Sequence, residues 1–261
     1  MHISSDKTEA LEQLRSRVQA IEGLTRDFGD ILPLGVADID QTLPWGGLPL
    51  GCLHHVVGAD EALGGVAPAA GAFVAATAGR LKSRGDVMWC LPRYKPADSL
   101  YGPGLSMLGL DEDDLILVRA RDETEALWAM EEGLACADLA VVVGVLTSSL
   151  SLTAERRLQL AAERGGTTGF LLQPGPSAAT AGAAVTRWRV GSMPSVPPAW
   201  SGLGRPRWHL TLDRCRQGTT RSWIVEWCDE TRDLRLAAPL CDRPADPVAV
   251  THGGAALRAV A

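Results

Sequence analysis

The sequence predicts an α/β protein whose central sheet is mostly parallel, with a helix at the N-terminus and antiparallel strands near the C-terminus. Between residues 51 and 173, apolar stretches of strand length alternate with stretches of helical period. This alternation is typical of parallel strands joined by helices. After residue 173 the helical stretches stop, and residues 207–215, 222–228 and 233–238 are expected to form strands joined by turns.

Three parts are expected along the chain. A length of 261 residues allows one large domain with a short appendage. Residues 1–33 are assigned to an amphipathic helix and linker, and residues 34–238 to the α/β domain, with antiparallel strands from about residue 185. Residues 239–261 are rich in Pro, Ala and Gly and are expected to form a flexible tail.

The first predicted helix spans Ser5 to Asp27. It carries an apolar stripe at heptad-like spacing, made of Leu11, Leu14, Val18 and Ile21. A helix of this length needs a partner surface in water, and that surface is either its own domain or another subunit. Residues 31–51 follow, where glycines and prolines are expected to break regular structure.

Strands are predicted at residues 51–58, 86–92, 114–120, 138–146 and 167–173. The run Leu139 to Val143 is apolar without alternation, as expected for a central parallel strand covered on both faces. Helices are predicted from the loop after residue 58 to about residue 81, at 98–110, at 123–137 and at 152–163. Asp122 and Glu125 have the spacing of a capping box at the third helix.

Residues 51–78 have the layout of a phosphate-binding loop, which is a buried strand, a glycine-bearing loop and a helix. The chemistry of such a loop is missing. Counting from Gly58, Leu63, Gly64 and Gly65 stand where Gly, Lys and Ser or Thr are required, and the nearest cation downstream is Arg80. We therefore expect a nucleotide-binding architecture without its nucleotide site; the alternative is an ordinary turn from strand to helix.

Composition excludes several other classes. No apolar window approaches the roughly 18 residues of a membrane span, and the start of the chain lacks the plan of a signal peptide, so a cytoplasmic protein is expected. The six cysteines form no CxxC pair, so neither a zinc site nor a disulfide framework is expected. The net charge of −6 argues against non-specific nucleic-acid binding by the whole surface.

The region from residue 181 to 235 is nevertheless locally basic, with nine arginines against five acidic residues. Alternation in residues 185–190 puts Arg187 and Arg189 on one face of a strand and Trp188 on the other, where it is expected in the core. Arg187 and Arg189 are candidate DNA contacts, since nucleic-acid affinity needs cations on phosphates. Arginine and tryptophan are also enriched in protein interfaces, so further candidates for partner binding are Arg205, Arg207, Trp208, Arg214 and Arg216.

The order of these elements resembles the RecA-like ATPase core. Residues 34–58 carry a Leu-Gly-x-x-x-(Leu/Ile)-Asp run and a Gly-Gly-Leu-Pro turn before the first core strand, as RecA does. More specifically, the chain resembles the ImuA family of inducible-mutagenesis proteins, from about Leu34 to Cys228. The segments that carry this resemblance are 98–105, 108–111, 156–163, 177–190 and 205–215.

The chain departs from the ATPase pattern at three places. The loop lacks its lysine. The strand that should end in a magnesium-associated Asp ends in Gly144, and Asp138 lies at the other end of that strand. ATPases carry a water-activating Glu after the strand that here ends at residue 92, but this chain continues with Arg93 and Tyr94. Without these groups little is left to stabilise phosphoryl transfer. We therefore expect no enzyme activity, no catalytic residue, no cofactor and no metal site.

The ImuA resemblance implies a non-catalytic adaptor in damage-induced, error-prone translesion DNA synthesis. The implied partners are an ImuB-like inactive Y-family polymerase, an error-prone C-family polymerase and the RecA filament, with possible direct contact to DNA and no membrane. The apolar stripe Leu11, Leu14, Val18 and Ile21 and the basic strands are the hypothesised docking faces. Two alternatives stay open: a SulA-like inhibitor of cell division in the SOS response, and a divergent NTPase.

Overall fold

The computed structural model describes residues 28–59, 67–93, 100–175, 182–197, 202 and 204–237. The strands are β1 (Ile31–Leu32), β2 (Leu48–Pro49), β3 (Leu53–Gly58), β4 (Asp86–Pro92), β5 (Leu115–Ala120), β6 (Leu139–Val145), β7 (Thr168–Gln173), β8 (Thr186–Met193), β9 (Arg207–Cys215), β10 (Arg221–Cys228) and β11 (Asp233–Leu236). The helices are α2 (Ala37–Thr42), α3 (Pro68–Gly79), α4 (Gly102–Met107), α5 (Glu123–Leu134) and α6 (Leu152–Gly165).

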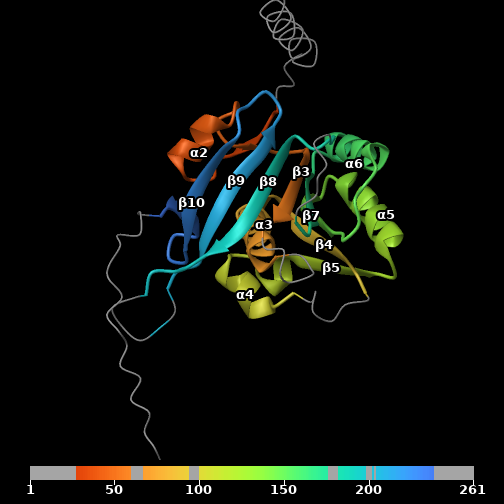
Figure 1. The fold of residues 1–261 in the computed structure, drawn as a ribbon. Helices are drawn as coiled ribbons and strands as arrows, with labels where there is room; N and C mark the ends of the chain where they lie inside the picture. Colours follow the sequence, from red (N-terminus) through yellow and green to blue (C-terminus); the bar gives the residue numbers. More distant parts are fainter. Residues whose placement is uncertain are drawn as a thin grey trace, which may run out of the picture.

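One large mixed sheet organises the described residues (Figure 1). Its order is β11-β10-β9-β8-β3-β7-β6-β4-β5, and β1 and β2 form a separate antiparallel pair. Neighbouring strands from β8 to β5 are parallel, and those from β8 to β11 are antiparallel. The predicted fold class is confirmed, and the arrangement is consistent with a RecA-like core.

Strand β8 joins the two kinds of pairing. It is parallel to β3 on one side and antiparallel to β9 on the other. Antiparallel strands are expected from about residue 185. That expectation holds where β8 pairs with β9, but not where it pairs with β3. The alternation of residues 186–190 is as predicted, with Trp188 fully buried and Arg187 and Arg189 half-buried.

The sheet is covered by helices on both faces over its parallel half. Val141 and Val143 of β6 belong to the core cluster that contains α3, whereas Val142 between them belongs to the cluster that contains α5 and α6. Alternate residues of one strand thus pack into two separate apolar layers. This confirms the prediction that the unalternating run Leu139–Val143 is a central strand. Among the described residues, no helix is long and apolar enough to cross a membrane.

The passage from residue 31 to 51 is more regular than the sequence predicts. Helix α2 forms there because the Asp40 carboxylate accepts hydrogen bonds from the Leu34 and Gly35 N–H groups at 2.7 and 3.2 Å. Burial raises the pKa of Asp40, and these two bonds oppose that rise. Four apolar residues of this passage are buried against the domain: Leu34, Val36, Ile39 and Leu43.

Contacts to the domain begin at the first described residue. Phe28 is buried and packs edge-on against Trp45 with ring centroids 5.0 Å apart. Strand β1 then pairs with β2. Residues 28–32 therefore lie on the α/β domain, slightly before the predicted boundary at residue 34. The predicted helix 5–27 and the predicted tail 239–261 lie outside the described residues.

A chain of hydrogen bonds crosses the core at β3. The His54 ring lies 2.7 Å from the Thr186 hydroxyl through Nδ1 and 2.8 Å from the Pro49 carbonyl through Nε2, and the Trp188 indole N–H lies 2.9 Å from the same hydroxyl. The Pro49 carbonyl only accepts and the indole only donates. Nε2 of His54 therefore carries the proton, and the hydroxyl of Thr186 donates to Nδ1.

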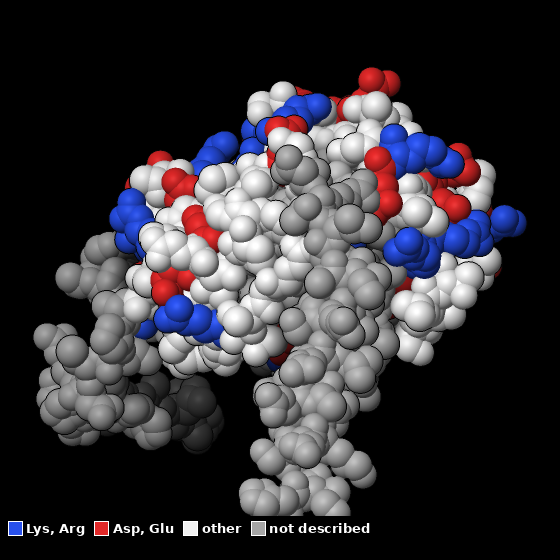
Figure 2. Space-filling model, turned by 90° about the horizontal axis from the view of Figure 1, so that it is seen from above, with Lys and Arg blue, Asp and Glu red and all other residues white. Residues whose placement is uncertain are grey.

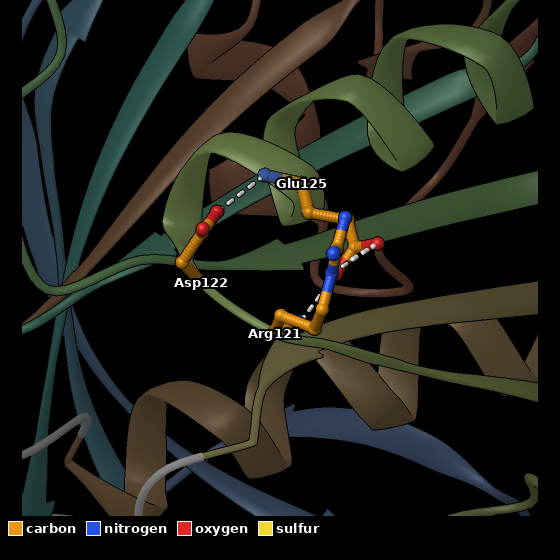
Figure 3. Close-up of polar contacts among 3 residues, drawn as sticks. All are labelled: Arg121, Asp122 and Glu125. Atoms are coloured by element: carbon orange, nitrogen blue, oxygen red, sulfur yellow. Dashed lines mark hydrogen bonds and ion pairs between the residues drawn. The ribbon is translucent and has the colours of Figure 1, made fainter.

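Helix α5 begins with the predicted capping arrangement (Figure 3). The Asp122 side chain accepts from the Glu125 N–H at 2.8 Å, so it satisfies a backbone donor that has no partner within the helix. Glu125 reaches back one residue further than in the standard box, to the Arg121 N–H and guanidinium. Its pKa is lowered by these bonds.

Acid should destabilise the fold through His54. Burial lowers the pKa of His54 from 6.5 to about 4. Between those values the unfolded chain binds a proton that the folded chain does not, so the free energy of unfolding falls as the pH drops from about 6.5 to about 4. At about 1.4 kcal/mol per pKa unit, the loss is of the order of 3 kcal/mol.

Urea unfolding at neutral and acidic pH measures this loss. His55, whose pKa burial also lowers to about 4, contributes in the same direction. The comparison is therefore made between the wild type and His54→Gln, with His209→Gln as the exposed control. His54→Gln should be less stable at neutral pH and lose less stability on acidification. An unchanged pH dependence in His54→Gln would contradict the assignment.

Removing the cap of α5 should weaken the domain. Asp122→Ala leaves the Glu125 N–H without its side-chain acceptor, and the loss of such a cap costs about 1 kcal/mol. Asp122→Asn keeps an acceptor oxygen at the same place and serves as the matched control. Urea denaturation compares the two variants; equal destabilisation by Asn and Ala would show that the cap is not the cause.

Candidate functional site

The first candidate site lies where the parallel strands end. Carboxyl ends of parallel strands meet at one edge of a sheet, where ligands bind in proteins of this kind. Strand β3 reaches this edge at Gly58, and the turn into α3 resumes at Ala67. A Cβ added to Gly58 would lie 2.4 Å from the Ala67 Cβ. The start of α3 therefore lies tightly against the end of the strand. Residues 60–66 are outside the described part of the chain.

Arg80, the nearest cation after the loop in the sequence, lies far from it. It is the C-cap of the 12-residue helix α3, so the helix separates it from the loop by about 18 Å. Its guanidinium lies 3.4 Å from the Asp233 carboxylate at the opposite end of the helix from the loop. Arg80 is therefore not positioned to replace the missing lysine.

The acidic positions of the ATPase pattern are also displaced. Asp138 precedes β6 and lies beside Gly85, at the amino edge of the sheet. Gly144 near the carboxyl end packs on Met130, whose sulfur would be 2.4 Å from an added Cβ. Arg93 follows β4 and its N–H donates to the Ala120 carbonyl at 2.8 Å. Tyr94 lies outside the described residues.

A carboxylate that does lie at the carboxyl edge is Glu123, the first residue of α5. It accepts from the N–H groups of Thr147 and Ser148, at 2.7 and 3.3 Å, and from both of their hydroxyls. These bonds fasten the segment after β6 to α5. In this arrangement the Glu123 carboxylate supports a loop, and its oxygens are occupied by protein donors.

The second candidate site is the arginine-rich part of β8 to β11. Arg189 is bound by Asp213 at 2.7 Å, Arg205 by Glu230 at 2.7 Å, and Arg207 by Glu226. Each of these cations already faces a carboxylate. On the face that Figure 2 shows, basic and acidic residues are likewise interspersed. Phosphate binding gains most from unpaired cations, so these pairs reduce what this region offers to nucleic acid.

Three more arginines and a glutamate meet at the base of the segment between β7 and β8. Arg214 donates to the Ala184 carbonyl at 2.6 Å and Arg216 to the Ala183 carbonyl at 3.4 Å, while the Ala183 N–H donates to the buried Glu155 carboxylate at 2.8 Å. Arg187 shares this environment, and desolvation lowers the pKa values of both Arg187 and Arg214. These side chains hold the end of the segment in place.

Two of the hypothesised contact residues, Trp208 and Arg207, are inside the protein. Trp208 is 4% exposed and packs in the core, and the Arg207 side chain is 5% exposed. Arg205 is the most accessible of the hypothesised partner contacts that the structure describes, and 44% of its side chain is exposed. The stripe Leu11, Leu14, Val18 and Ile21 lies outside the described residues. The site hypotheses thus stay predictions, and the geometry favours Arg205 over Arg207 and Trp208.

Burial shifts the pKa values of both histidines of β3 and of two cysteines. His54 and His55 point to opposite faces of β3: His54 contacts Thr186, whereas His55 lies near Arg187 and Gln173. Burial raises the pKa of Cys90 to about 12 and that of Cys215 to about 11. The residues that the structure describes contain no group of three or more side chains suited to a metal ion.

One surface was not anticipated from the sequence. Helices α5 and α6 expose Trp128, Leu152 and Leu160, at 62%, 59% and 48%. The signal for it was present in the spacing of Leu152 and Leu160, which are eight residues apart and therefore lie two steps of four along one ridge of a helix. It was obscured because the inner faces of the same helices are also apolar.

Together the fold and the site define a class: a mixed α/β protein with the layout of a phosphate-loop domain whose loop sequence lacks the phosphate-binding lysine. No protein-family model matches the chain. Over 221 residues it is 42% identical to Protein ImuA from two strains of Caulobacter vibrioides, covering 79% of this chain and 87% of those relatives. The chain belongs to the ImuA family.

The hydrogen bond between the Ala183 N–H and the Glu155 carboxylate can be tested by substitution. Glu155→Ala removes the acceptor of the Ala183 N–H, whereas Glu155→Gln keeps an oxygen there. A hydrogen bond to a charged group contributes about 1.5–3 kcal/mol, so exchange of the Ala183 amide should accelerate by about tenfold or more in the alanine variant. Hydrogen exchange followed by NMR measures this. Equal exchange in the Ala variant and the wild type would mean that Glu155 does not hold the segment.

Proposed function

We propose that this chain is a non-catalytic adaptor in damage-induced, error-prone translesion DNA synthesis. Membership of the ImuA family supports a role in this mutagenesis pathway. The observation that carries the non-catalytic part is the loop after β3, where Leu63, Gly64 and Gly65 replace the phosphate-binding residues, with Arg80 held at the far end of α3. Phosphoryl transfer depends on such groups, and their loss leaves a scaffold for binding.

The proposed partners are an ImuB-like inactive Y-family polymerase, an error-prone C-family polymerase and the RecA filament. The proposed docking elements are the apolar stripe of residues 11–21 and the exposed Arg205 region. A direct DNA contact through Arg187 and Arg189 is the weaker part of the proposal, since Arg189 is paired with Asp213.

Point variants are better suited to the test than deletions. Strand β8 lies directly beside β3 in the middle of the sheet, so removing the C-terminal strands would open the core. The N-terminal stripe is instead altered with Leu14→Asp plus Val18→Asp. The matched control is Gln13→Asp plus Gln19→Asp, which adds the same charge on the predicted polar side of the same helix.

The full chain should be retained by the immobilised ImuB-like protein, and separately by RecA bound to single-stranded DNA with ATP. The stripe variant should lose retention by at least one of them, because two buried carboxylates are costly in an apolar contact, while the control variant keeps it. Circular dichroism checks folding. A folded wild-type chain that neither partner retains would refute the adaptor proposal, and cell filamentation on overexpression without DNA damage would then favour a division inhibitor.

A further inference from the structure

Helices α5 and α6 lie side by side on the outside of the sheet (Figure 1). An apolar groove of about 300 Å³ runs between them, lined by Leu127 and Trp128 on α5 and by Ala154 and Leu158 on α6. An ion pair of 2.6 Å between Glu131 and Arg157 crosses the groove. The two helices therefore form one continuous surface rather than two separate ridges.

The two helices differ in the sign of their charge. Helix α5 contains the acids Glu123, Glu125, Glu131 and Glu132 and no basic residue. Helix α6 exposes Arg156, Arg157 and Arg164, whereas its acid Glu155 is buried and its acid Glu163 is half-buried. Glu123 and Glu125 bond to residues of their neighbouring loops, and Glu131 pairs with Arg157. The exposed charges outward of these bonds are Glu132 on α5 and Arg156 and Arg164 on α6, so the acid lies on one half of the surface and the guanidinium groups on the other.

Large apolar side chains lie among these charges. Trp128 on α5 is 62% exposed, and Leu152 and Leu160 on α6 are 59% and 48% exposed. Leu152, Arg156, Leu160 and Arg164 follow one another at intervals of four residues, so they form a single row along α6. Exposed tryptophan beside arginine is the composition of interface hot spots.

We propose that this surface, defined by the exposed faces of α5 and α6, binds the same surface of a second copy of the chain. A two-fold axis parallel to the helices and running along the groove brings the acidic α5 of each copy onto the basic α6 of the other. A two-fold axis across the helices would instead bring α5 onto α5 and α6 onto α6, and charges of the same sign would then face each other. The charge pattern therefore selects a closed, isologous dimer with one orientation.

The positions of the residues along the helix axes, called heights below, agree with this pairing. The Glu131–Arg157 ion pair fixes which turn of α5 lies beside which turn of α6. A parallel axis preserves these heights, so Trp128 of one copy faces the turn of α6 that carries Leu152 and Arg156 of the other. Glu132 is about one turn further along and faces the turn between Arg156 and Leu160. Trp128 thereby covers apolar surface and stacks near a guanidinium, which is favourable.

The dimer should be weak and sensitive to salt. Helices of 12 and 14 residues are about 18 and 21 Å long, so the surface is at the lower end of specific interfaces. Its ion pairs lie at the rim, where salt screens them. Dissociation on dilution and in high salt is therefore expected.

Charge reversal provides the test. Glu132→Arg and Arg156→Glu each put like charges together at both symmetric halves of a homodimer. In an equimolar mixture of the two variants, every contact between position 132 of one chain and position 156 of the other again has opposite charges. Sedimentation velocity at increasing concentration should show a dimer for the wild type, monomers for each variant alone, and a dimer for the mixture.

Controls separate this result from changes in total charge or folding. Asp113→Arg and Arg235→Glu make the same charge changes at exposed residues away from α5 and α6, and they should leave the dimer intact. Trp128→Glu should abolish it, whereas Tyr101→Glu, at a residue 72% exposed elsewhere, should not. Circular dichroism checks that each variant is folded.

Three outcomes would overturn the proposal. The first is a wild-type chain that stays monomeric up to about 100 µM, where weak specific dimers form. The second is a mixture of the two charge variants that fails to restore dimers. The third is a monomeric wild type whose retention by an ImuB-like protein is lost in Trp128→Glu, since the surface would then belong to a different protein. Partner retention without dimerisation would leave the adaptor function standing.

Discussion

The fold depends on burying β3 between β7 and β8. All six residues of this strand are buried, including the polar His54 and His55. A buried polar side chain is tolerated only when it is hydrogen-bonded, and for His54 the bonds from Trp188 through Thr186 to the ring and on to Pro49 meet that requirement. These bonds also link β8 to β3 side chain to side chain, at the point where the parallel half of the sheet joins the antiparallel half.

This constraint explains why the core packing does not require the phosphate-binding residues that the loop sequence lacks. The apolar layers on the two faces of the sheet are formed by strand interiors and by α3, α5 and α6. None of those contacts requires a lysine in the loop or a carboxylate at the carboxyl edge. At that edge Glu123 is hydrogen-bonded to Thr147 and Ser148. The packing of the core therefore does not depend on the residues that the loop sequence lacks.

The charged residues are arranged differently in the C-terminal strands and on α5 and α6. In the C-terminal strands most of the described arginines face carboxylates or backbone carbonyls of the same chain, such as Arg189 with Asp213 and Arg214 with Ala184. On α5 and α6 the charges are instead sorted by sign onto neighbouring helices. A basic composition therefore identified a region of internal ion pairs, while the exposed apolar side chains of α5 and α6 lie in a part of the chain with ordinary composition.

The sequence by itself determined the order and type of the elements, because periodicity and capping are local: β4 and β9 match their predicted bounds, and Asp122 caps α5. It also determined the loss of the phosphate-binding residues. Only the tertiary structure decided that α2 forms, that β8 is parallel to β3, that Trp208 is buried and that Arg207 faces Glu226. Those features depend on contacts between residues distant in the chain, whose pairing no local pattern specifies.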